Sequence, residues 1–479
     1  MKKYNNFING KFVPASNGAV IKVINPATEE VISEVPDSTD EDANKAVEAA
    51  YSVRKEWARL PAIERADYIR KLTKGLKDNK DLFAKTVCEE QGKIFGLAQG
   101  EVDFAVSLME FAAEWARRIE GEIIPSDFKD QNILIFREPY GVCAGIIPWN
   151  FPLAIIGRKI GPALISGNCM ILKPSTDTPN SAFEFAQIVQ QAGLPNGVIN
   201  VISGRGSKVG KALVTNPKVA FVSITGSVEA GQQVMRDAAE NMTRISLELG
   251  GKAPYIVMDD ADLDLTAAAC SSGRFFNVAG QICIGAERIY VQEGIAPKFI
   301  KKLVEEVKKV KVGDPMQADV GMGPLITKAS LERVEQMVNK AVSEGAKVLC
   351  GGKRPANLKK GFFYEGTVLS NCRQDMEIIR KEIFGPVLPV VTFKTVDEAI
   401  ALANDCEYGL ASSIYTTNMR TAMKAANELE FGETYINRSA MDQVQGFHAG
   451  WKKSGIGGED GKYGTLEYTH TRVVTVNYA

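Results

Sequence analysis

The chain of 479 residues is too long for one hydrophobic core, so we expect two or three domains. Its content of 45% hydrophobic and 24% charged residues is typical of an ordinary soluble globular protein. The 57 Lys and Arg residues balance 58 Asp and Glu residues without any block of like charge, which argues against nucleic acid and anionic membranes as partners.

The N-terminal stretch, residues 1–18, starts with basic residues but lacks the apolar core of a signal peptide. No apolar run approaches the length that spans a bilayer. We therefore expect a cytosolic protein whose eight cysteines are reduced thiols. Because His448 and His470 are the only histidines, no metal site of the His/Cys kind is expected, and a general base should be a carboxylate.

The first elements are a hairpin and a series of helices. Asn9 and Gly10 predict the turn of a β-hairpin. The next segment, up to Trp57, predicts a helix that Ser38 and Glu41 begin at capping-box spacing. Two further helical stretches are expected up to about residue 118, followed by polar extended arms that could reach outside a domain.

The region 141–258 alternates short apolar runs with amphipathic segments. The runs are GVCAGII, NCMILK, GVINVIS, VAFVSIT, RISLEL and PYIVM. This alternation predicts a parallel sheet covered by helices on both faces. A second alternating region follows from about 262 to 430. The β-rich C-terminal tail is expected to pair with the arms at 121–138.

Polar and glycine residues directly after these runs are candidates for a ligand site, because ligands bind at the carboxyl ends of parallel strands. Gly226, Ser227 and Gly231 stand where a helix N-terminus could bind phosphate, although a plain tight turn fits equally. Lys173 could bond ribose hydroxyls, or it could be an exposed lysine before a proline turn.

Three further residues suit acyl chemistry. Cys283 lies in a turn of small residues and could be a nucleophile or a small core residue. Asn150, in a turn closed by two prolines, could donate to an oxyanion together with the Cys283 backbone N–H. Glu248 ends an apolar strand, where burial would raise its pKa and suit a general base, whereas a solvent-facing edge glutamate is the alternative.

These pieces fit one reaction. A thiolate attacks a carbonyl carbon, hydride passes to a nicotinamide, and a water activated by a carboxylate hydrolyses the thioester. The chain resembles the aldehyde dehydrogenase superfamily at this point. The motifs NPATEEVI, PWNFPL, LKPS, TGS, LELGGKAP, GQIC and EIFGPV occur in the order and at the spacings of that family.

The resemblance implies an α/β fold with a Rossmann-type dinucleotide-binding domain, an α/β catalytic domain and a small β oligomerisation arm. The implied bounds are 1–120 with 139–249, then 250–445, and 121–138 with 446–479. The family assembles as dimers or tetramers through the arm, so a homo-oligomer is expected.

The resemblance also implies the roles of individual residues. Cys283 matches the nucleophile, Glu248 the general base and Asn150 the oxyanion donor. The implied contacts to NAD or NADP are Ile146, Trp149, Lys173, Ser175, Thr176, Gly206, Gly210, Gly226, Ser227, Gly231, Leu249, Glu382 and Phe384.

Within the superfamily, EWARRIEGEII, FGETYINR and QGFHAGWKKSGIGGEDGK resemble lactaldehyde and glycolaldehyde dehydrogenases. That resemblance places Arg158, Asp442 and His448 in the substrate funnel, with an interdomain salt bridge as the alternative for Arg158. Two positions depart from the pattern. Ile284 replaces a polar residue, and Thr176 replaces the acid of NAD-preferring members, which makes NADP plausible.

We therefore expect an NAD(P)-dependent enzyme that oxidises a small polar aldehyde to its acid. Lactaldehyde, glycolaldehyde, succinate semialdehyde and sulfolactaldehyde all fit the funnel. A CoA-acylating dehydrogenase and a non-catalytic structural relative are the alternatives. Glu248 argues against the first, and the intact set of Cys283, Glu248 and Asn150 argues against the second.

Overall fold

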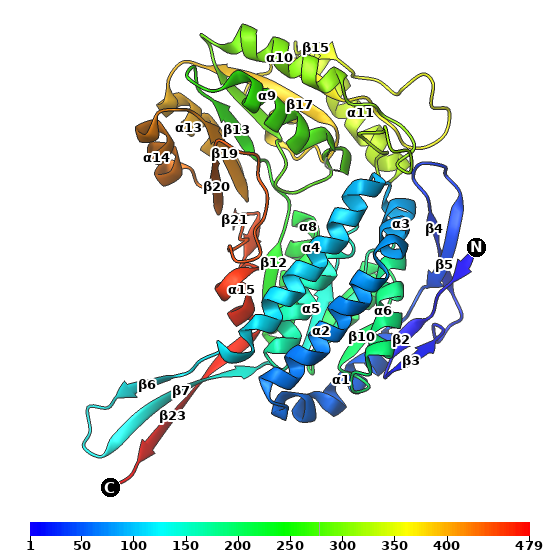
Figure 1. The fold of residues 1–479 in the computed structure, drawn as a ribbon, viewed down its shortest axis with the longest axis vertical. Coiled ribbons are helices and arrows are strands. Elements are labelled where there is room, and N and C mark those ends of the chain that lie inside the picture. Colours follow the sequence, from blue (N-terminus) through cyan, green and yellow to red (C-terminus); the bar gives the residue numbers. More distant parts are fainter. Residues whose placement is uncertain (277) are drawn as a thin grey trace.

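The computed structural model describes residues 1–276 and 278–479. The chain forms two α/β lobes, one around an eight-stranded sheet and the other around a seven-stranded sheet (Figure 1). A long three-stranded arm extends from the first lobe and carries the C-terminus at its tip. The predicted α/β class is confirmed.

The sheet of the first lobe has a parallel centre. Its strand order is β22 (Gly455–Ile456), β12 (Arg244–Glu248), β11 (Phe221–Thr225), β8 (Val142–Ile146), β9 (Cys169–Lys173), β10 (Ile199–Val201), β2 (Asn6–Ile8) and β3 (Lys11–Val13). The five strands from β12 to β10 are parallel, and β22, β2 and β3 are antiparallel additions at the two edges. Five of the six predicted apolar runs are these central strands, and the hairpin at Asn9 and Gly10 is confirmed as β2–β3.

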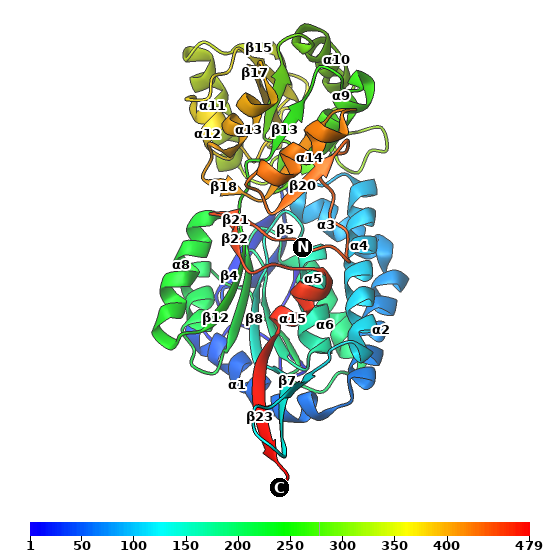
Figure 2. The ribbon, with the colours of Figure 1, turned by 90° about the vertical axis from the view of Figure 1, so that its left-hand side faces the viewer.

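Helices cover both faces of this sheet. They are α1 (Asp40–Arg59), α2 (Ala62–Asp78), α3 (Lys80–Gln91), α4 (Phe95–Glu114), α5 (Ala154–Ile165), α6 (Asn180–Ala192), α7 (Lys211–Val214) and α8 (Val228–Ala238). Helices α1, α7 and α8 lie on one face, and α5 and α6 lie on the other with α2, α3 and α4 packed outside them (Figure 2). The expected cover on both faces is therefore present.

Two local predictions in this lobe were wrong. Helix α1 begins one residue later than expected, because Asp42 accepts the backbone N–H of Thr39 at 2.9 Å and closes the capping box there. The hydroxyl of Ser38 is instead buried and accepts a hydrogen bond from Asn6. Three helices, not two, follow α1, because Gly92 adopts a left-handed φ of 83° and ends α3.

The second lobe is built on the same plan. Its strand order is β15 (Lys347–Cys350), β16 (Thr367–Ser370), β17 (Val387–Phe393), β14 (Arg288–Gln292), β13 (Pro254–Val257), β19 (Ala411–Tyr415) and β20 (Glu433–Ile436), and its helices are α9 (Leu263–Ser271), α10 (Ala296–Lys308), α11 (Lys328–Ser343), α12 (Glu377–Arg380), α13 (Val396–Asn404) and α14 (Met419–Glu428). Neighbouring residues Ile289 and Tyr290 pack into different cores on the two faces of the sheet. The sixth predicted run, PYIVM, is β13 and belongs to this lobe.

The arm consists of β6 (Glu122–Pro125), β7 (Gln131–Pro139) and β23 (Thr469–Asn477), with β7 in the middle. The tail pairs with the arm, as predicted, and this pairing lies within one chain. Between the second lobe and β23, the strand β22 joins the first-lobe sheet and α15 (Gly461–Glu467) packs against α5.

Short strands complete the chain: β1 (Lys2–Lys3), β4 (Val20–Ile24), β5 (Val31–Pro36), β18 (Tyr408–Gly409) and β21 (Trp451–Lys452). Within the two described ranges, none of the helices combines the length and the apolar character that crossing a bilayer requires.

Candidate active site

A cavity of about 1810 Å³ lies between the two lobes. Residues that follow β8, β11 and β12 form one wall, and residues of the second lobe form the other, as expected where the carboxyl ends of parallel strands meet. Eleven predicted site residues line it: Trp149, Asn150, Arg158, Gly226, Ser227, Leu249, Cys283, Glu382, Phe384, Asp442 and His448.

Cys283 follows the short helical turn η5 (Val278–Gly280) and reaches the cavity. Its side chain is partly exposed, whereas Cys143, Cys169 and Cys270 are sealed in the cores. Gly280 is required in the turn because its φ is 74° and a Cβ there would lie 2.3 Å from the carbonyl oxygen of Gly385. Burial raises the pKa of the Cys283 thiol, and a hydrogen bond with His448 acts against that rise.

Asn150 lies in the loop before α5, and both its side chain and its backbone carbonyl form hydrogen bonds. Its side-chain Nδ2 donates to the carbonyl of Gln281 at 2.9 Å, two residues from Cys283. Its own carbonyl accepts from Lys93 Nζ at 3.0 Å. Lys93 is buried in an ion pair with Glu101, whose carboxylate also accepts the backbone N–H of Leu153 at 2.9 Å.

The pair of Lys93 and Glu101 was missed by the sequence reasoning. The available signal is Glu101 itself, a charged residue inside the apolar face of α4, because ionised groups are rarely buried without a partner. The pair connects α3 and α4 to the loop that presents Asn150.

Glu248 ends β12 and is 2% exposed. Strands β11 and β22 flank β12, so the alternative of a solvent-facing edge glutamate was wrong. Neither carboxylate oxygen has a hydrogen-bond partner among the described residues, and the nearest cation is His448, with Nε2 at 3.5 Å from Oε2. Burial raises the pKa of Glu248 well above the usual range, although the charge of His448 opposes this.

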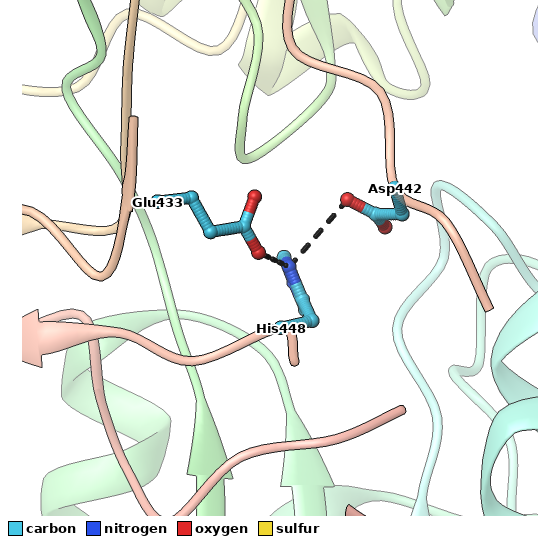
Figure 3. Close-up of side chains that lie close together, drawn as sticks. All are labelled: Glu433, Asp442 and His448. Carbon is cyan, nitrogen blue, oxygen red and sulfur yellow. Dashed lines mark hydrogen bonds and ion pairs between the residues drawn. The ribbon is translucent and has the colours of Figure 1, made fainter. Parts of the chain in front are cut away.

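His448 lies among carboxylates (Figure 3). Its Nδ1 is 2.6 Å from Oε1 of Glu433, on β20, and 3.5 Å from Oδ1 of Asp442. Burial would lower the pKa of His448, but the negative charges of Asp442 and Glu248 outweigh it and raise that pKa well above its usual value.

Glu433, Asp442 and His448 also offer three potential metal-ligand atoms within 4.8 Å of one another. Two of these atoms, Glu433 Oε1 and His448 Nδ1, already form the short contact of 2.6 Å. The absence of a metal remains a prediction. Glu433 was not among the predicted residues, because nothing in the strand FGETYINR distinguishes it from a surface glutamate.

Arg158, on α5, forms the salt bridge that was its alternative assignment. Its guanidinium binds Asp460 through two contacts of 3.0 and 2.7 Å and Asp442 through a third of 2.7 Å. The arginine still lines the cavity. The next residue, Lys159, pairs with Glu459 at 2.5 Å and is fully buried.

The N-terminus of α8 closes the other end of the cavity. Ser227 caps it by accepting the N–H of Ala230 at 3.2 Å, and Ser227, Val228 and Glu229 line the wall. The other N–H groups of the first turn, those of Val228 and Glu229, have no acceptor within the helix and suit a phosphate. Gly231 serves packing, because a Cβ there would lie 2.5 Å from the Leu249 side chain.

Glu382 and Phe384 line the same cavity as this helix terminus and Cys283. Glu382 accepts the N–H of Gly251 at 2.8 Å, and burial raises its pKa to about 7. A Cβ at Gly250 would lie 2.5 Å from the Glu382 carboxylate, so the two glycines after Glu248 allow that carboxylate to approach. The ring of Phe384 meets Trp149 edge-on at 5.3 Å.

Glu287 binds the backbone of the turn that carries Glu382 and Phe384, and the sequence did not predict this role. Its carboxylate accepts the backbone N–H groups of Ile383 at 2.9 Å and Phe384 at 3.1 Å and pairs with Lys252 and Arg274. Burial opposes ionisation of Glu287, but the charges of Arg274 and Lys252 lower its pKa to about 2.

The other eight predicted residues are not among those that line the cavity: Glu248, Gly231, Ile146, Lys173, Ser175, Thr176, Gly206 and Gly210. Lys173 is buried at the end of β9, where its Nζ donates to the Pro174 carbonyl at 3.1 Å and burial lowers its pKa to about 8. It is not the exposed lysine of the alternative assignment. Ser175 and Thr176 follow it, Ile146 ends β8, and Gly206 and Gly210 begin and end the helical turn η2 (Gly206–Gly210).

Together these groups fit a dinucleotide. The first turn of α8 offers free N–H groups to a pyrophosphate, and Lys173 has two further donor positions beyond its single hydrogen bond within the described ranges. Glu382 presents a carboxylate that can accept ribose hydroxyls.

Comparison with known proteins agrees with the geometry. The model of the aldehyde dehydrogenase family matches residues 12–474. Lactaldehyde dehydrogenase of Escherichia coli strain K12 is 53% identical over 469 residues, which cover 98% of this chain and 97% of that protein. Its crystal structure has a TM-score of 0.97 over 99% of both chains.

A second solved structure, 3,6-anhydro-L-galactose dehydrogenase in complex with NAP, is 44% identical with a TM-score of 0.97, covering 99% of this chain and 100% of that one. The resemblance predicted from the motifs, and with it the fold of this family, is thus confirmed. The chain belongs to the aldehyde dehydrogenase family and is an NAD(P)-dependent oxidoreductase that acts on aldehydes.

Proposed function

We propose that this enzyme oxidises a small, uncharged hydroxyaldehyde of the lactaldehyde or glycolaldehyde type to the corresponding acid. The observation that carries the proposal is that one cavity brings together Cys283, Asn150, Asp442 and His448, and extends to the N-terminus of α8. The similarity to a lactaldehyde dehydrogenase supports it.

In the proposed reaction, the thiolate of Cys283 forms a bond to the aldehyde carbon, and the carbonyl π electrons move to oxygen. The side chain of Asn150, together with the backbone N–H of Cys283, donates to the resulting oxyanion. Bound NAD(P)+ supplies the hydride acceptor that oxidises this carbon to a thioester. Glu248 then takes a proton from a water whose oxygen attacks the thioester, which releases the acid and returns the Cys283 sulfur.

The charges around the funnel favour an uncharged substrate. Arg158 is already bound to Asp442 and Asp460, so its charge is not free for a substrate anion. The four carboxylates of Glu433, Asp442, Glu459 and Asp460 outnumber the three cations Arg158, Lys159 and His448, and burial raises the pKa of Glu248. This excess of negative charge would repel an anionic substrate, whereas the hydroxyl group of an uncharged substrate can donate a hydrogen bond to Asp442.

One observation favours succinate semialdehyde or sulfolactaldehyde as the substrate, namely that Arg158 lines the cavity. A panel of lactaldehyde, glycolaldehyde, propanal and succinate semialdehyde, each with NAD+ and NADP+, separates the two classes. We expect the highest kcat/KM for a hydroxyaldehyde and at least about tenfold less for succinate semialdehyde, which corresponds to about 1.4 kcal/mol. A preference for succinate semialdehyde would reject the uncharged substrate.

The role of Cys283 is tested with the same assay. Cys283→Ser should abolish NAD(P)H formation while nucleotide binding persists, and turnover in that variant would remove Cys283 as the nucleophile. Wild-type turnover should need no CoA, because Glu248 supplies a base for hydrolysis. An absolute CoA requirement would indicate acyl transfer to CoA.

We further propose that the residues around Lys173 bind the adenosine end of the dinucleotide. They are Ile146, Ser175, Thr176, Gly206 and Gly210, and the support is their position at or after the carboxyl ends of β8, β9 and β10, which follow β11 in the sheet. The uncharged Thr176 leaves room for a 2′-phosphate without repulsion, so NADP+ use is proposed beside NAD+.

The arm is proposed to join subunits. Apolar side chains on it are exposed in the single chain, with Ile123 74%, Phe128 72%, Val473 60% and Tyr478 61% accessible. We propose a homodimer or homotetramer of a cytosolic enzyme, with domains at 1–120 and 139–249, 250–445, and 121–138 with 446–479. Within the last of these, β22 is the part that joins the first-lobe sheet.

A further inference from the structure

The two nitrogens of His448 face different partners. On one side, Nδ1 is 2.6 Å from Glu433 and 3.5 Å from Asp442. On the other side, Nε2 is 3.5 Å from Glu248, and Cys283 lines the same cavity as the imidazole. The ring is 3% exposed, so the described protein groups and not bulk water surround it.

This placement sets the tautomer of the neutral ring. The contact with Glu433 requires a proton on Nδ1, because a carboxylate oxygen only accepts. The lone pair is then on Nε2, on the side of Glu248 and away from Glu433. A neutral imidazole in this state can take the proton of Cys283.

Charged groups face the ring from every element packed around it. They are Glu248 of β12, Glu433 of β20, Asp442 of the following loop, Glu459 and Asp460 before α15, and Arg158 and Lys159 of α5. The carboxylates are in excess, so together they favour a positively charged ring.

We propose that Cys283 and His448 form a thiolate–imidazolium pair, with Glu433 and Asp442 as the groups that orient the imidazolium. In the step that forms the pair, the S–H bond of Cys283 breaks, its proton forms an N–H bond at Nε2, and no net charge is created. The inference rests on the proposed role of Cys283 as nucleophile. It makes His448 a catalytic residue that ionises the thiol and leaves water activation to Glu248.

The rate at which iodoacetamide alkylates Cys283, without aldehyde or nucleotide, tests this inference. Burial alone raises the pKa of the Cys283 thiol, so the pair requires that the imidazolium charge outweighs burial. In that case the wild-type rate should stay high well below the ordinary thiol pKa of about 8.5, because the thiolate is already present. In His448→Gln, we expect the alkylation rate to be about tenfold to a hundredfold lower than in the wild type at pH 6.5. This difference in rate should become smaller above pH 9. Peptide mass spectrometry assigns the label, with Cys283→Ser as the blank.

Two variants and one spectrum keep the test decisive. Glu433→Gln should lower the alkylation rate by an intermediate factor, because the carboxylate that contacts Nδ1 is removed while the imidazole remains. Glu248→Gln removes one of the charges that favour the imidazolium and should slow alkylation less than His448→Gln does, and a shift there without one in His448→Gln would assign the thiol proton to Glu248. The ultraviolet absorbance of the thiolate, taken as wild type minus Cys283→Ser, needs no His448 variant. If it titrates only near or above pH 8.5, the pair does not exist.

A role of His448 in substrate binding alone predicts a different result. In that case His448→Gln would lower kcat/KM for lactaldehyde but not for propanal, and alkylation would not change. The ion pair predicts similar losses of kcat/KM for both aldehydes together with slower alkylation. If Cys283→Ser remained active, the proposed nucleophile would fail, whereas an inactive Cys283→Ser with unchanged alkylation of His448→Gln would overturn only the pair.

Discussion

At the scale of single residues, burial decides the chemistry of Glu248. The same glutamate on an exposed edge would be ionised and solvated, whereas here it is enclosed and its two oxygens have no hydrogen-bond partner within the described ranges. A carboxylate in this state is a stronger base and is not occupied by another group.

This leads to a prediction for the pH dependence of hydrolysis. Because burial raises the pKa of Glu248, the acidic limb of kcat should lie above the usual range of a glutamate, and kcat should rise with pH as Glu248 loses its proton. Glu248→Gln should lower steady-state kcat by about 10²–10⁴-fold and leave a burst of NAD(P)H. Rapid-mixing absorbance measures both, and an unchanged steady state would remove the base role.

A second residue-level prediction concerns the choice of nucleotide. Thr176→Glu places a negative charge where a 2′-phosphate is proposed to lie, and so should lower the NADP+/NAD+ ratio of kcat/KM by about tenfold. Thr176→Gln, of similar size and without charge, is the matched control and should change the ratio little. If the NADP+/NAD+ ratio of kcat/KM were equal in the wild type and Thr176→Glu, the adenosine ribose would not lie next to Thr176.

At the scale of elements, Glu287 holds the turn that carries Glu382 and Phe384. Breaking a buried ion pair on one side usually costs about 3–5 kcal/mol, so Glu287→Gln should lower Tm clearly. It should also weaken NAD(P)H binding, measured by fluorescence, because the backbone of Ile383 and Phe384 loses its charged acceptor. Glu48→Gln, which breaks an exposed pair with Lys218, is the control and should leave both unchanged.

The pH dependence of that stability has a definite sign. The pKa of Glu287 is about 2 in the fold, below the value of about 4.3 for an unperturbed glutamate. Its contribution is therefore complete above about pH 5 and is lost as the pH falls towards 2. The difference in Tm between the wild type and Glu287→Gln should narrow over this range, and a difference that widens towards acid would contradict the assignment.

The comparison of sequence with structure also belongs to the element scale. Strand positions were predictable because the apolar runs have the length and the β-branched content of buried strands, and the motifs located Cys283, Asn150 and Glu382. The first cap of α1 was missed by one residue because Ser38 and Thr39 both suit the position and only the burial of Ser38 decides between them.

What the sequence could not provide is the pairing of charges. Arg158 meets Asp442 and Asp460 across about 300 positions of chain, and Glu433 meets His448, which lies 15 positions further on and outside the named elements, so no helix or strand pattern records either contact. The resemblance identified Arg158, Asp442 and His448 as neighbours of a substrate. Only the geometry shows that the arginine is neutralised and that the histidine lies between carboxylates and the thiol.

At the scale of the whole molecule, the arm is the part whose surface does not suit a single chain. We expect Val473→Asp to shift the enzyme towards monomers, because it places a charge on an exposed apolar strand. Light scattering after size-exclusion chromatography measures the mass. Met419→Asp, on an exposed methionine of the second lobe, is the control and should leave the assembly intact, and an unaltered mass of Val473→Asp would remove this residue from the interface.

The contact between Gly251 and the nucleophile loop has a practical consequence. A Cβ at Gly251 would lie 2.4 Å from the carbonyl oxygen of Cys283, and the N–H of the same glycine binds Glu382. Adding one methyl group at this position would displace both of these residues together, although the glycine has no side chain to take part in any reaction. Directed evolution towards other substrates should therefore keep glycine at position 251. Residues that line the cavity, such as Ile284, are the positions to vary, because their side chains are not part of the contact of Gly251 with Cys283 and Glu382.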